Sequence, residues 1–240
     1  MPDHIEAAAT PASRPAPSER RLGAIVVGQS PRPDITGLLQ EAVGPATRVE
    51  LVGCLDGLTR AEIEALTPVD GADTLFTKLP DGSGVKFGKR HILGRAQALI
   101  DRFADEGTTA TVMCCTGSFP KLTPRGVVVF PSAVLAGLAQ GLLPAGRLGR
   151  LVPLPAQVEG LADKWRRPGI EVVAEALLPI SDAAETARAA DRLAAQKPDL
   201  VVMDCISYTP AQRAVVRERI AAPVLLAVSA TAAVLREMLG

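Results

Sequence analysis

Two stretches of the sequence resemble each other: TTATVMCCTGS at residues 108–118 and PDLVVMDCISYT at residues 198–209. Each runs from an apolar segment through a methionine and one further residue to a cysteine, and continues into small hydroxylated or glycine residues. Each also follows a segment with a helical pattern of similar length. The repetition predicts two related lobes, each with a strand that ends in a cysteine-bearing loop. The alternative is a coincidental likeness between two buried strands.

From residue 22 to the end, segments rich in β-branched residues alternate with amphipathic segments. This alternation is typical of an α/β fold, in which helical crossovers join a mostly parallel sheet. The segment 79–90, LPDGSGVKFGKR, contains Asp-Gly and Gly-x-Gly and predicts a hairpin turn with an extended arm. We expect strands at residues 22–27, 47–52, 73–78, 110–114, 127–130, 147–152, 170–176, 199–204 and 223–227. We expect helices at residues 34–43, 59–66, 90–106, 131–141, 155–166, 183–196, 210–220 and 229–239.

The composition limits the classes of partner. Among 240 residues, 26 are basic and 26 acidic, so no net charge favours nucleic acid or an anionic membrane. Only 3% of the residues are aromatic, which argues against a base-stacking surface, and no apolar run is long enough to cross a bilayer. A small polar ligand in a cleft fits this balance best.

The first twenty residues, MPDHIEAAATPASRPAPSER, are rich in Pro, Ala and Ser and lack apolar periodicity. Such a segment cannot bury enough apolar surface to become ordered, so we expect residues 1–20 to form a disordered tail. The apolar segment after Arg20 and Arg21, LGAIVVG, is too short for a signal sequence and is interpreted as a strand. We therefore expect a cytoplasmic protein whose four cysteines are reduced.

Cys115 and Cys205 are the candidates for chemistry, because both follow strands of a predicted parallel sheet, where ligands bind outside the carboxyl ends. A thiolate is a strong nucleophile and can act as a base, but a free thiol is mostly protonated at neutral pH. Its ionisation needs a hydrogen-bonding loop or a helix N-terminus. Thr209 and Pro210 predict a helix start close to Cys205. The backbone N–H groups of residues 116–118 could hold a carboxylate beside Cys115.

The other cysteines and the histidines limit the kinds of catalytic or metal site that the chain can form. Cys54 is expected to pack in the core, and Cys114 should point into the core because successive strand residues face opposite sides. There is no C-x-x-C pair, and the only histidines are His4 and His91, so neither a zinc site nor a histidine-containing triad is expected. The chain also lacks the glycine-rich motifs that bind nucleotide phosphates. We expect neither a metal nor a cofactor.

Six segments of the sequence resemble the AroM family, a branch of the aspartate/glutamate (hydantoin) racemase superfamily. The resemblance covers residues 22–240 and is most specific in the letters GQSPR and in the two cysteine loops. The segments are GAIVVGQSPRPDI at 23–35, LDGLTRAEIEAL at 55–66, DTLFTKLPDG at 73–82, CCTGSFP at 114–120, RLVPLPAQ at 150–157 and MDCISYTP at 203–210.

The resemblance implies the architecture of that superfamily: two similar α/β lobes with mostly parallel sheets, related by a pseudo-twofold axis, with the active site in the cleft between them. Residues 21–130 together with 225–240 would form the first lobe, and residues 131–224 the second. The superfamily places one catalytic cysteine on each lobe, and the two face each other across the substrate. The matching positions here are Cys115 and Cys205. The resemblance also suggests cofactor-independent chemistry and a homodimer.

The sequence departs from the amino-acid racemases in the segments that hold the substrate carboxylate. Residues 28–32, GQSPR, replace an acidic-serine turn, and residues 152–155, VPLP, replace a glycine-threonine turn, so aspartate or glutamate cannot be assumed as substrate. Arg32 is the natural replacement anchor for a carboxylate, through bidentate pairing, and the alternative is a solvated loop arginine. We expect the substrate to be bound by Gln29, Ser30, Arg32, Thr116, Gly117, Ser118, Ser207 and Tyr208.

These observations favour a racemase or epimerase that acts at the acidic α-carbon of a small carboxylate. One thiolate would remove the proton on one face while the opposing thiol delivers a proton to the other. Two alternatives remain open. One is a cysteine-dependent isomerase or lyase of the maleate isomerase or arylmalonate decarboxylase type. The other is a non-catalytic protein that binds a small ligand in the same cleft.

Overall fold

The computed structural model describes residues 20–160 and 163–240. Of the segment 1–20 that the sequence predicts to be a tail, residues 1–19 lie outside the described residues. Arg20 opens the first strand, and its guanidinium donates a hydrogen bond to the carbonyl of Leu239.

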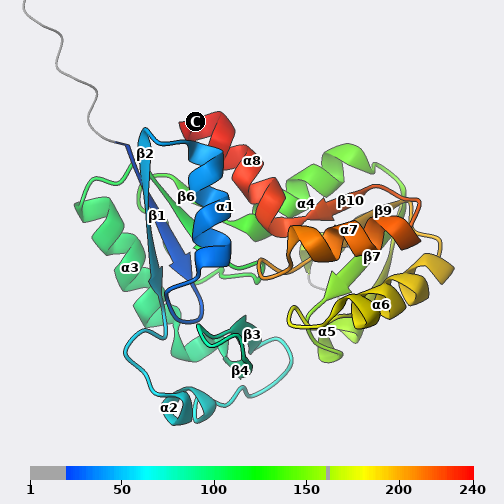
Figure 1. Ribbon diagram of the computed structural model, residues 1–240, viewed down its shortest axis with the longest axis horizontal. Coiled ribbons are helices and arrows are strands. Elements are labelled where there is room, and N and C mark those ends of the chain that lie inside the picture. Colours follow the sequence, from blue (N-terminus) through cyan, green and yellow to red (C-terminus); the bar gives the residue numbers. More distant parts are fainter. Residues whose placement is uncertain (1–19, 161–162) are drawn as a thin grey trace, which may run out of the picture.

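The first lobe is built on a parallel sheet of four strands in the order β2-β1-β5-β6 (Figure 1). All five residues of β5 are buried, as is typical of a parallel sheet with covered faces. The strands are β1 (Arg20–Val26), β2 (Thr47–Gly53), β5 (Ala110–Cys114) and β6 (Val128–Val129). The helices of this part of the chain are α1 (Pro33–Val43), α2 (Arg60–Glu64), the short 3-10 helix η1 (Lys89–His91) and α3 (Leu93–Asp105).

The second lobe contains a separate parallel sheet of four strands in the order β10-β9-β7-β8 (Figure 1). Its strands are β7 (Gly146–Val152), β8 (Ile170–Ala176), β9 (Leu200–Met203) and β10 (Val224–Leu226). The remaining helices are α4 (Pro131–Leu142), α5 (Ala156–Glu159), the 3-10 helix η2 (Asp163–Trp165), α6 (Ala183–Ala195), α7 (Pro210–Arg219) and α8 (Ala227–Leu239).

The two sheets follow the same plan. In the first sheet, β1 lies between β2 and β5; in the second, β7 lies between β8 and β9. The cysteine loops leave β5 and β9, which occupy equivalent places beside the central strand. The predicted α/β fold with two similar, mostly parallel lobes is therefore confirmed.

An antiparallel hairpin interrupts the first lobe, where the sequence predicts a hairpin turn. Strands β3 (Thr74–Lys78) and β4 (Gly84–Gly88) pair along their full lengths, and Gly82 takes a positive φ in the turn between them. The extended arm expected at this place is therefore a second strand. The hairpin lies next to the carboxyl end of β1 (Figure 1), and its Thr77 lies against Gly28, which follows that strand closely.

The prediction of one continuous helix at residues 155–166 is wrong. The structure has the short helix α5, which begins after Pro155 and ends at Gly160, and then the 3-10 helix η2. Gly160 adopts an extended backbone conformation, and glycine disfavours helix continuation. The buried indole of Trp165 fixes the second segment in the core. The apolar periodicity that predicted one helix thus belongs to two short elements.

The last helix joins the two lobes. Helix α8 packs against α1 of the first lobe and also against α4 (Figure 1). The carbonyl of Leu239 near its end accepts hydrogen bonds from Arg20 and from Thr47 at the start of β1 and β2. One apolar core cluster consequently runs through both lobes, and Cys114 is buried in it, as expected from strand alternation. Within the described residues, none of the helices combines the length and apolarity that a membrane crossing needs.

Candidate active site

The two cysteine loops meet at one small cavity between the lobes. Cys115 directly follows β5, and Cys205 comes two residues after β9. Both line a cavity of about 20 Å³, together with Arg32, Thr116 and Ser207. Such a volume holds about one water molecule. The structure thus brings together the two thiols from loops that are far apart in the sequence.

Two glycines let the loop after β1 approach this cavity closely. A Cβ atom at Gly28 would clash with the hydroxyl of Thr77, which lines the cavity from the hairpin. A Cβ atom at Gly53 would lie 2.5 Å from the carbonyl oxygen of Gly28. Side chains at these positions would push the loop away, so the spacing of the elements around the thiols depends on both glycines.

The two thiols differ in their surroundings. Burial raises the pKa of Cys115, but the N–H of Gly117, which donates to its sulfur over 3.3 Å, and the charge of Lys164 oppose the effect. Burial raises the pKa of Cys205 to about 12; the N–H of Ser207 opposes this effect, and the nearby Cys115 adds to it. Cys115 is partly exposed, whereas Cys205 is buried. Cys115 is therefore the thiol that ionises more readily.

Arg32 lies at the small cavity, but most of its donors are already used. Its side chain is only 2% exposed, and its Nε and Nη2 pair with the two carboxylate oxygens of Asp34, both at 2.9 Å. Nη2 also donates to the hydroxyl of Ser207 in the other lobe, and Nη1 to the carbonyl of Lys78. A guanidinium has five N–H groups. Among the described residues, one N–H, on Nη1, has no acceptor and remains for a ligand, and the bidentate edge is occupied by Asp34.

The carboxylate of Asp34 stays ionised in this arrangement. Burial would raise its pKa, but hydrogen bonds and charges from Arg32 and Lys78 outweigh that effect and hold the pKa well below its usual range. Lys78 contacts the same carboxylate at 2.9 Å. The alternative of a solvated arginine at position 32 is wrong, because the side chain is buried between the lobes.

Gln29 and Ser30 hold the neighbouring loop. The amide nitrogen of Gln29 donates to the carbonyls of Leu55 and Leu58. Ser30 donates through its N–H and its hydroxyl to the carboxylate of Asp56, each over 2.7 Å. In the described chain, neither Gln29 nor Ser30 lines the small cavity. They support the loop that carries Arg32.

In the second lobe, the residues after Cys205 fix its loop. The buried Tyr208 donates its hydroxyl to the carbonyl of Leu177, and so lies away from the cavity. Thr209 and Gln212 form a reciprocal capping box at the start of α7, with a proline at the first helical turn, as the sequence predicts for Thr209. Of the predicted binding residues in this loop, Ser207 lines the cavity and Tyr208 does not.

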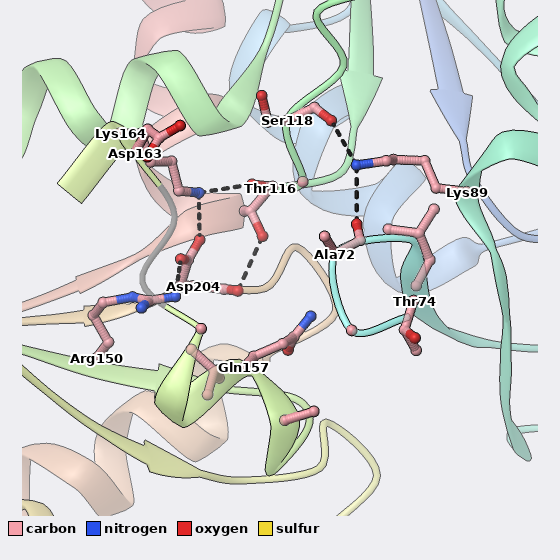
Figure 2. A pocket seen from close by; sticks show the side chains of 16 residues that line it. Ala72, Thr74, Lys89, Thr116, Ser118, Arg150, Gln157, Asp163, Lys164 and Asp204 are labelled. Atoms are coloured by element: carbon pink, nitrogen blue, oxygen red, sulfur yellow. Dashed lines mark hydrogen bonds and ion pairs between the residues drawn. The ribbon is translucent and has the colours of Figure 1, made fainter. Parts of the chain in front are cut away.

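The loop of residues 116–118 separates the small cavity from a larger one. Thr116 lines both, while Gly117 and Ser118 line a chamber of about 430 Å³ between the lobes (Figure 2). The hydroxyl of Thr116 donates to the carbonyl of Asp204, and its own carbonyl accepts from Lys164. The first contact joins the two cysteine loops directly, and the second joins the loop of Cys115 to η2.

Sequence reasoning missed a cluster of charged residues in the chamber wall. Asp204 is buried and contacts Arg150 at 3.2 Å and Lys164 at 2.9 Å (Figure 2). It also accepts a hydrogen bond from the indole N–H of Trp165. Burial would raise the pKa of Asp204, but Lys164 and Arg150 outweigh it and lower the pKa. An arginine inside the apolar run of β7 and an acid directly before Cys205 were signals of this cluster.

In the described part of the chain, no group of three or more His, Cys, Asp or Glu residues is placed to hold a metal ion. The two cavities offer a ligand thiols, hydroxyls, backbone N–H groups and cations, together with the carboxylates of Asp163 and Asp204 and the amide of Gln157.

Comparisons with known proteins identify relatives of this fold. A family model described as "AroM protein" matches residues 22–239. No curated protein matches the chain in sequence.

Solved structures that resemble the chain include three enzymes. Allantoin racemase from Pseudomonas fluorescens is 17% identical, with a TM-score of 0.57 over 91% of this chain and 90% of that one. Aspartate racemase from Picrophilus torridus is 15% identical, with a TM-score of 0.55 over 92% and 94%. A double mutant of arylmalonate decarboxylase is 13% identical, with a TM-score of 0.58 over 92% of each chain. At these identities the likeness establishes a common fold.

Proposed function

This chain belongs to the AroM family, and from that premise we propose that it is a cofactor-independent enzyme of the racemase or epimerase type, acting at the acidic α-carbon of a small carboxylate. The observation that carries the proposal is the shared cavity of Cys115 and Cys205. Each thiol comes from the equivalent loop of a different lobe, so a substrate carbon between them would face one sulfur on each side. Solved structures with the same fold include two racemases.

The chemistry needs one thiolate and one thiol. Cys115 acts as the first base: burial raises its pKa, but the N–H of Gly117 and the charge of Lys164 offset part of that rise. It removes the α-proton, and the electron pair moves onto the substrate carboxylate as an enediolate. Cys205, with its pKa raised to about 12 by burial, holds its proton and delivers it to the opposite face. The reverse reaction exchanges the two roles.

The developing negative charge needs hydrogen-bond donors at the cavity. Arg32 and the hydroxyl-bearing Ser207 line the cavity, and the backbone N–H groups of residues 116–118 lie on the loop that follows Cys115, so these groups can act as the donors. Gln29 and Ser30 contribute indirectly, because they support the loop that carries Arg32. The cavity must widen when the substrate enters, since about 20 Å³ cannot hold a carboxylic acid.

A lyase of the arylmalonate decarboxylase type is the second candidate. The unequal burial of the two thiols favours it, because a decarboxylation leaves a carbanion that needs a proton from one side only. Cys205 would then be the proton donor. A decarboxylase releases carbon dioxide from a disubstituted malonate, whereas a racemase returns the same acid, so product analysis separates the two.

The test is exchange of the α-proton with solvent. A panel of chiral 2-substituted carboxylic acids and malonates is incubated with the protein in D₂O, with a chelator and without pyridoxal phosphate, and followed by proton NMR. We expect loss of the α-proton signal for at least one acid, and no exchange with the Cys115→Ser/Cys205→Ser double variant. Cys54→Ser, a buried thiol that does not line the cavity, is the matched control and should keep exchange. Binding of an acid without exchange or decarboxylation would identify a non-catalytic protein.

A further inference from the structure

We infer that the larger chamber between the lobes binds the oxyanion group of an organic acid, a carboxylate or a phosphate, through Arg150, Lys164 and Lys89. The chamber measures about 430 Å³, within the range of roughly 300–1,000 Å³ that is usual for small-ligand sites. The chamber is a different cavity from the thiol cavity, which measures about 20 Å³. The inference concerns binding alone and holds whether or not the thiols catalyse a reaction.

The charge of the chamber favours an anion. Three cations line it, Arg150, Lys164 and Lys89, against two carboxylates. One carboxylate, Asp163, is fully exposed and has Arg166 beside it. The other, Asp204, is shared between Arg150 and Lys164, so the cluster of these three keeps one positive charge.

Lys89 adds a charge from the opposite wall. In the described residues its ammonium contacts the carbonyls of Ala72 and Ser118 and no carboxylate (Figure 2). Figure 2 shows Lys89 reaching toward the chamber from the side of the first lobe, while Lys164 and Arg150 lie on the side of the second. An anion between the walls would therefore meet cations from both lobes.

Arg150 has unused donors. Its side chain is 5% exposed, yet its Nε and Nη1 have no hydrogen-bond partner among the described residues. Only Nη2 is engaged, with Asp204, and the face of Trp165 lies 5.7 Å from the guanidinium carbon. Buried donors without a partner are rare in folded proteins, and a ligand is one of the explanations. Both nitrogens are closed off from solvent, so the acid group of a ligand would pair with them once the side chain turns toward the chamber.

The other lining residues of the chamber favour an organic molecule over an inorganic ion as the ligand. Leu75, Val152 and Ala156 give apolar surface, and Thr74 gives a hydroxyl. Gln157 uses its side-chain oxygen to accept from the N–H of Leu154, and its amide nitrogen points toward the open space (Figure 2). A molecule with an acid group, an apolar part and a hydrogen-bond acceptor matches these walls.

Isothermal titration of the full chain tests the inference. The probes are succinate, citrate and inorganic phosphate, with succinamide as the neutral control, all at equal ionic strength and up to about 10 mM. We expect saturable binding of at least one oxyanion and none of succinamide. Phosphate alone or carboxylates alone would tell which acid group the chamber takes.

Variants locate the site. Lys89→Met and Lys164→Met should each weaken binding about tenfold or more, because each removes a charge-assisted hydrogen bond. Arg150→Lys keeps the charge but removes the planar fork, and should also weaken binding. The exposed Lys121, which does not line the chamber, provides the matched control Lys121→Met with unchanged affinity.

The thiol variants keep this inference apart from the proposed reaction. The Cys115→Ser/Cys205→Ser double variant should bind the same probe with unchanged affinity, even if it has lost all exchange activity. Circular dichroism confirms that each variant is folded, and the half-buried Lys89, which pairs with no carboxylate among the described residues, is the safest substitution in this respect. The inference is overturned if folded wild type binds no probe, if succinamide binds as well as succinate, or if Lys89→Met and Lys121→Met behave alike.

Discussion

The loops of residues 114–118 and 204–209 occupy equivalent places in two similar lobes, but they surround their thiols differently. Cys115 is partly exposed and accepts a hydrogen bond from the N–H of Gly117. Cys205 is buried, and burial raises its pKa to about 12. A repeated loop thus fixes where a thiol lies, while its neighbours decide how readily it ionises.

Each thiol also has neighbours from the opposite lobe. Lys164 of the second lobe donates to the carbonyl of Thr116, next to the thiol of the first lobe. Arg32 of the first lobe donates to Ser207, next to the thiol of the second. Each cysteine loop is therefore completed only when the lobes are together, and the ionisation of the thiols depends on the contact between the lobes.

The largest expected effect comes from removing either thiol. Cys115→Ser and Cys205→Ser should each lower racemisation by about 10³-fold or more, since a serine hydroxyl is too weak an acid to replace a thiol and acid–base groups contribute roughly 10²–10⁴-fold. Circular dichroism or polarimetry of the substrate measures the rate. Full activity in either variant would show that the two loops are not a functional pair.

The largest effect on the free energy of unfolding is expected at the charged cluster of Asp204, Arg150 and Lys164 beside Cys205. Asp204→Asn leaves Arg150 and Lys164 without their buried counter-charge, which should lower the free energy of unfolding by about 3–5 kcal/mol. Urea denaturation measures it. Asp191→Asn, at a half-exposed carboxylate of α6, is the control and should change little. Equal stability of the two variants would show that the cluster is not buried in solution.

The pH dependence of the free energy of unfolding at alkaline pH compares the two thiols directly. In the unfolded chain a thiol ionises near its ordinary pKa of 9.0, whereas Cys205 in the fold keeps its proton to about 12. The unfolded state therefore binds fewer protons in this window, and stability falls as the pH rises above about 9. Cys205→Ser should make that fall shallower by at most about 1.4 kcal/mol per pH unit. Cys115→Ser should change the slope less, and identical slopes would remove the proposed asymmetry.

The smallest effect concerns the anchoring of the second loop. Tyr208→Phe removes the hydrogen bond to the carbonyl of Leu177 and should lower the free energy of unfolding by about 1 kcal/mol. Thermal denaturation measures it. Because the hydroxyl lies away from the cavity, the affinity for a substrate should stay unchanged. A large loss of binding would instead place Tyr208 at the ligand.

The sequence predicts the fold well where local pattern decides it. The strand expected at residues 110–114 is β5 to the residue, because a run of apolar and β-branched residues defines it. The strand expected at 170–176 is likewise β8. The two cysteine loops were found because the same pattern occurs twice. The helix expected at 155–166 failed because Gly160 and the burial of Trp165 divide that segment.

Parts of the site could not be predicted, because they depend on partners that are distant in the sequence. Asp204, Arg150 and Lys164 come from three different elements, and each charge is buried only because the other two are present. Pattern reasoning treats an isolated charge as exposed. The pairing of Arg32 with Asp34 was easier to predict, because the two residues lie two positions apart in the sequence. This pairing occupies the bidentate edge of the guanidinium that a ligand carboxylate was expected to use.

The unequal roles of Cys115 and Cys205 are tested most directly by half-reactions. A substrate analogue with a leaving group on the β-carbon undergoes elimination after one proton abstraction, so a single base suffices. Each enantiomer of such an analogue is given to Cys115→Ser and to Cys205→Ser, and release of the leaving group is followed. We expect each variant to act on one enantiomer only, opposite for the two, with the faster elimination in Cys205→Ser, which keeps the more readily ionised thiol. Elimination of both enantiomers by one variant would contradict a pair of thiols that face one carbon from opposite sides.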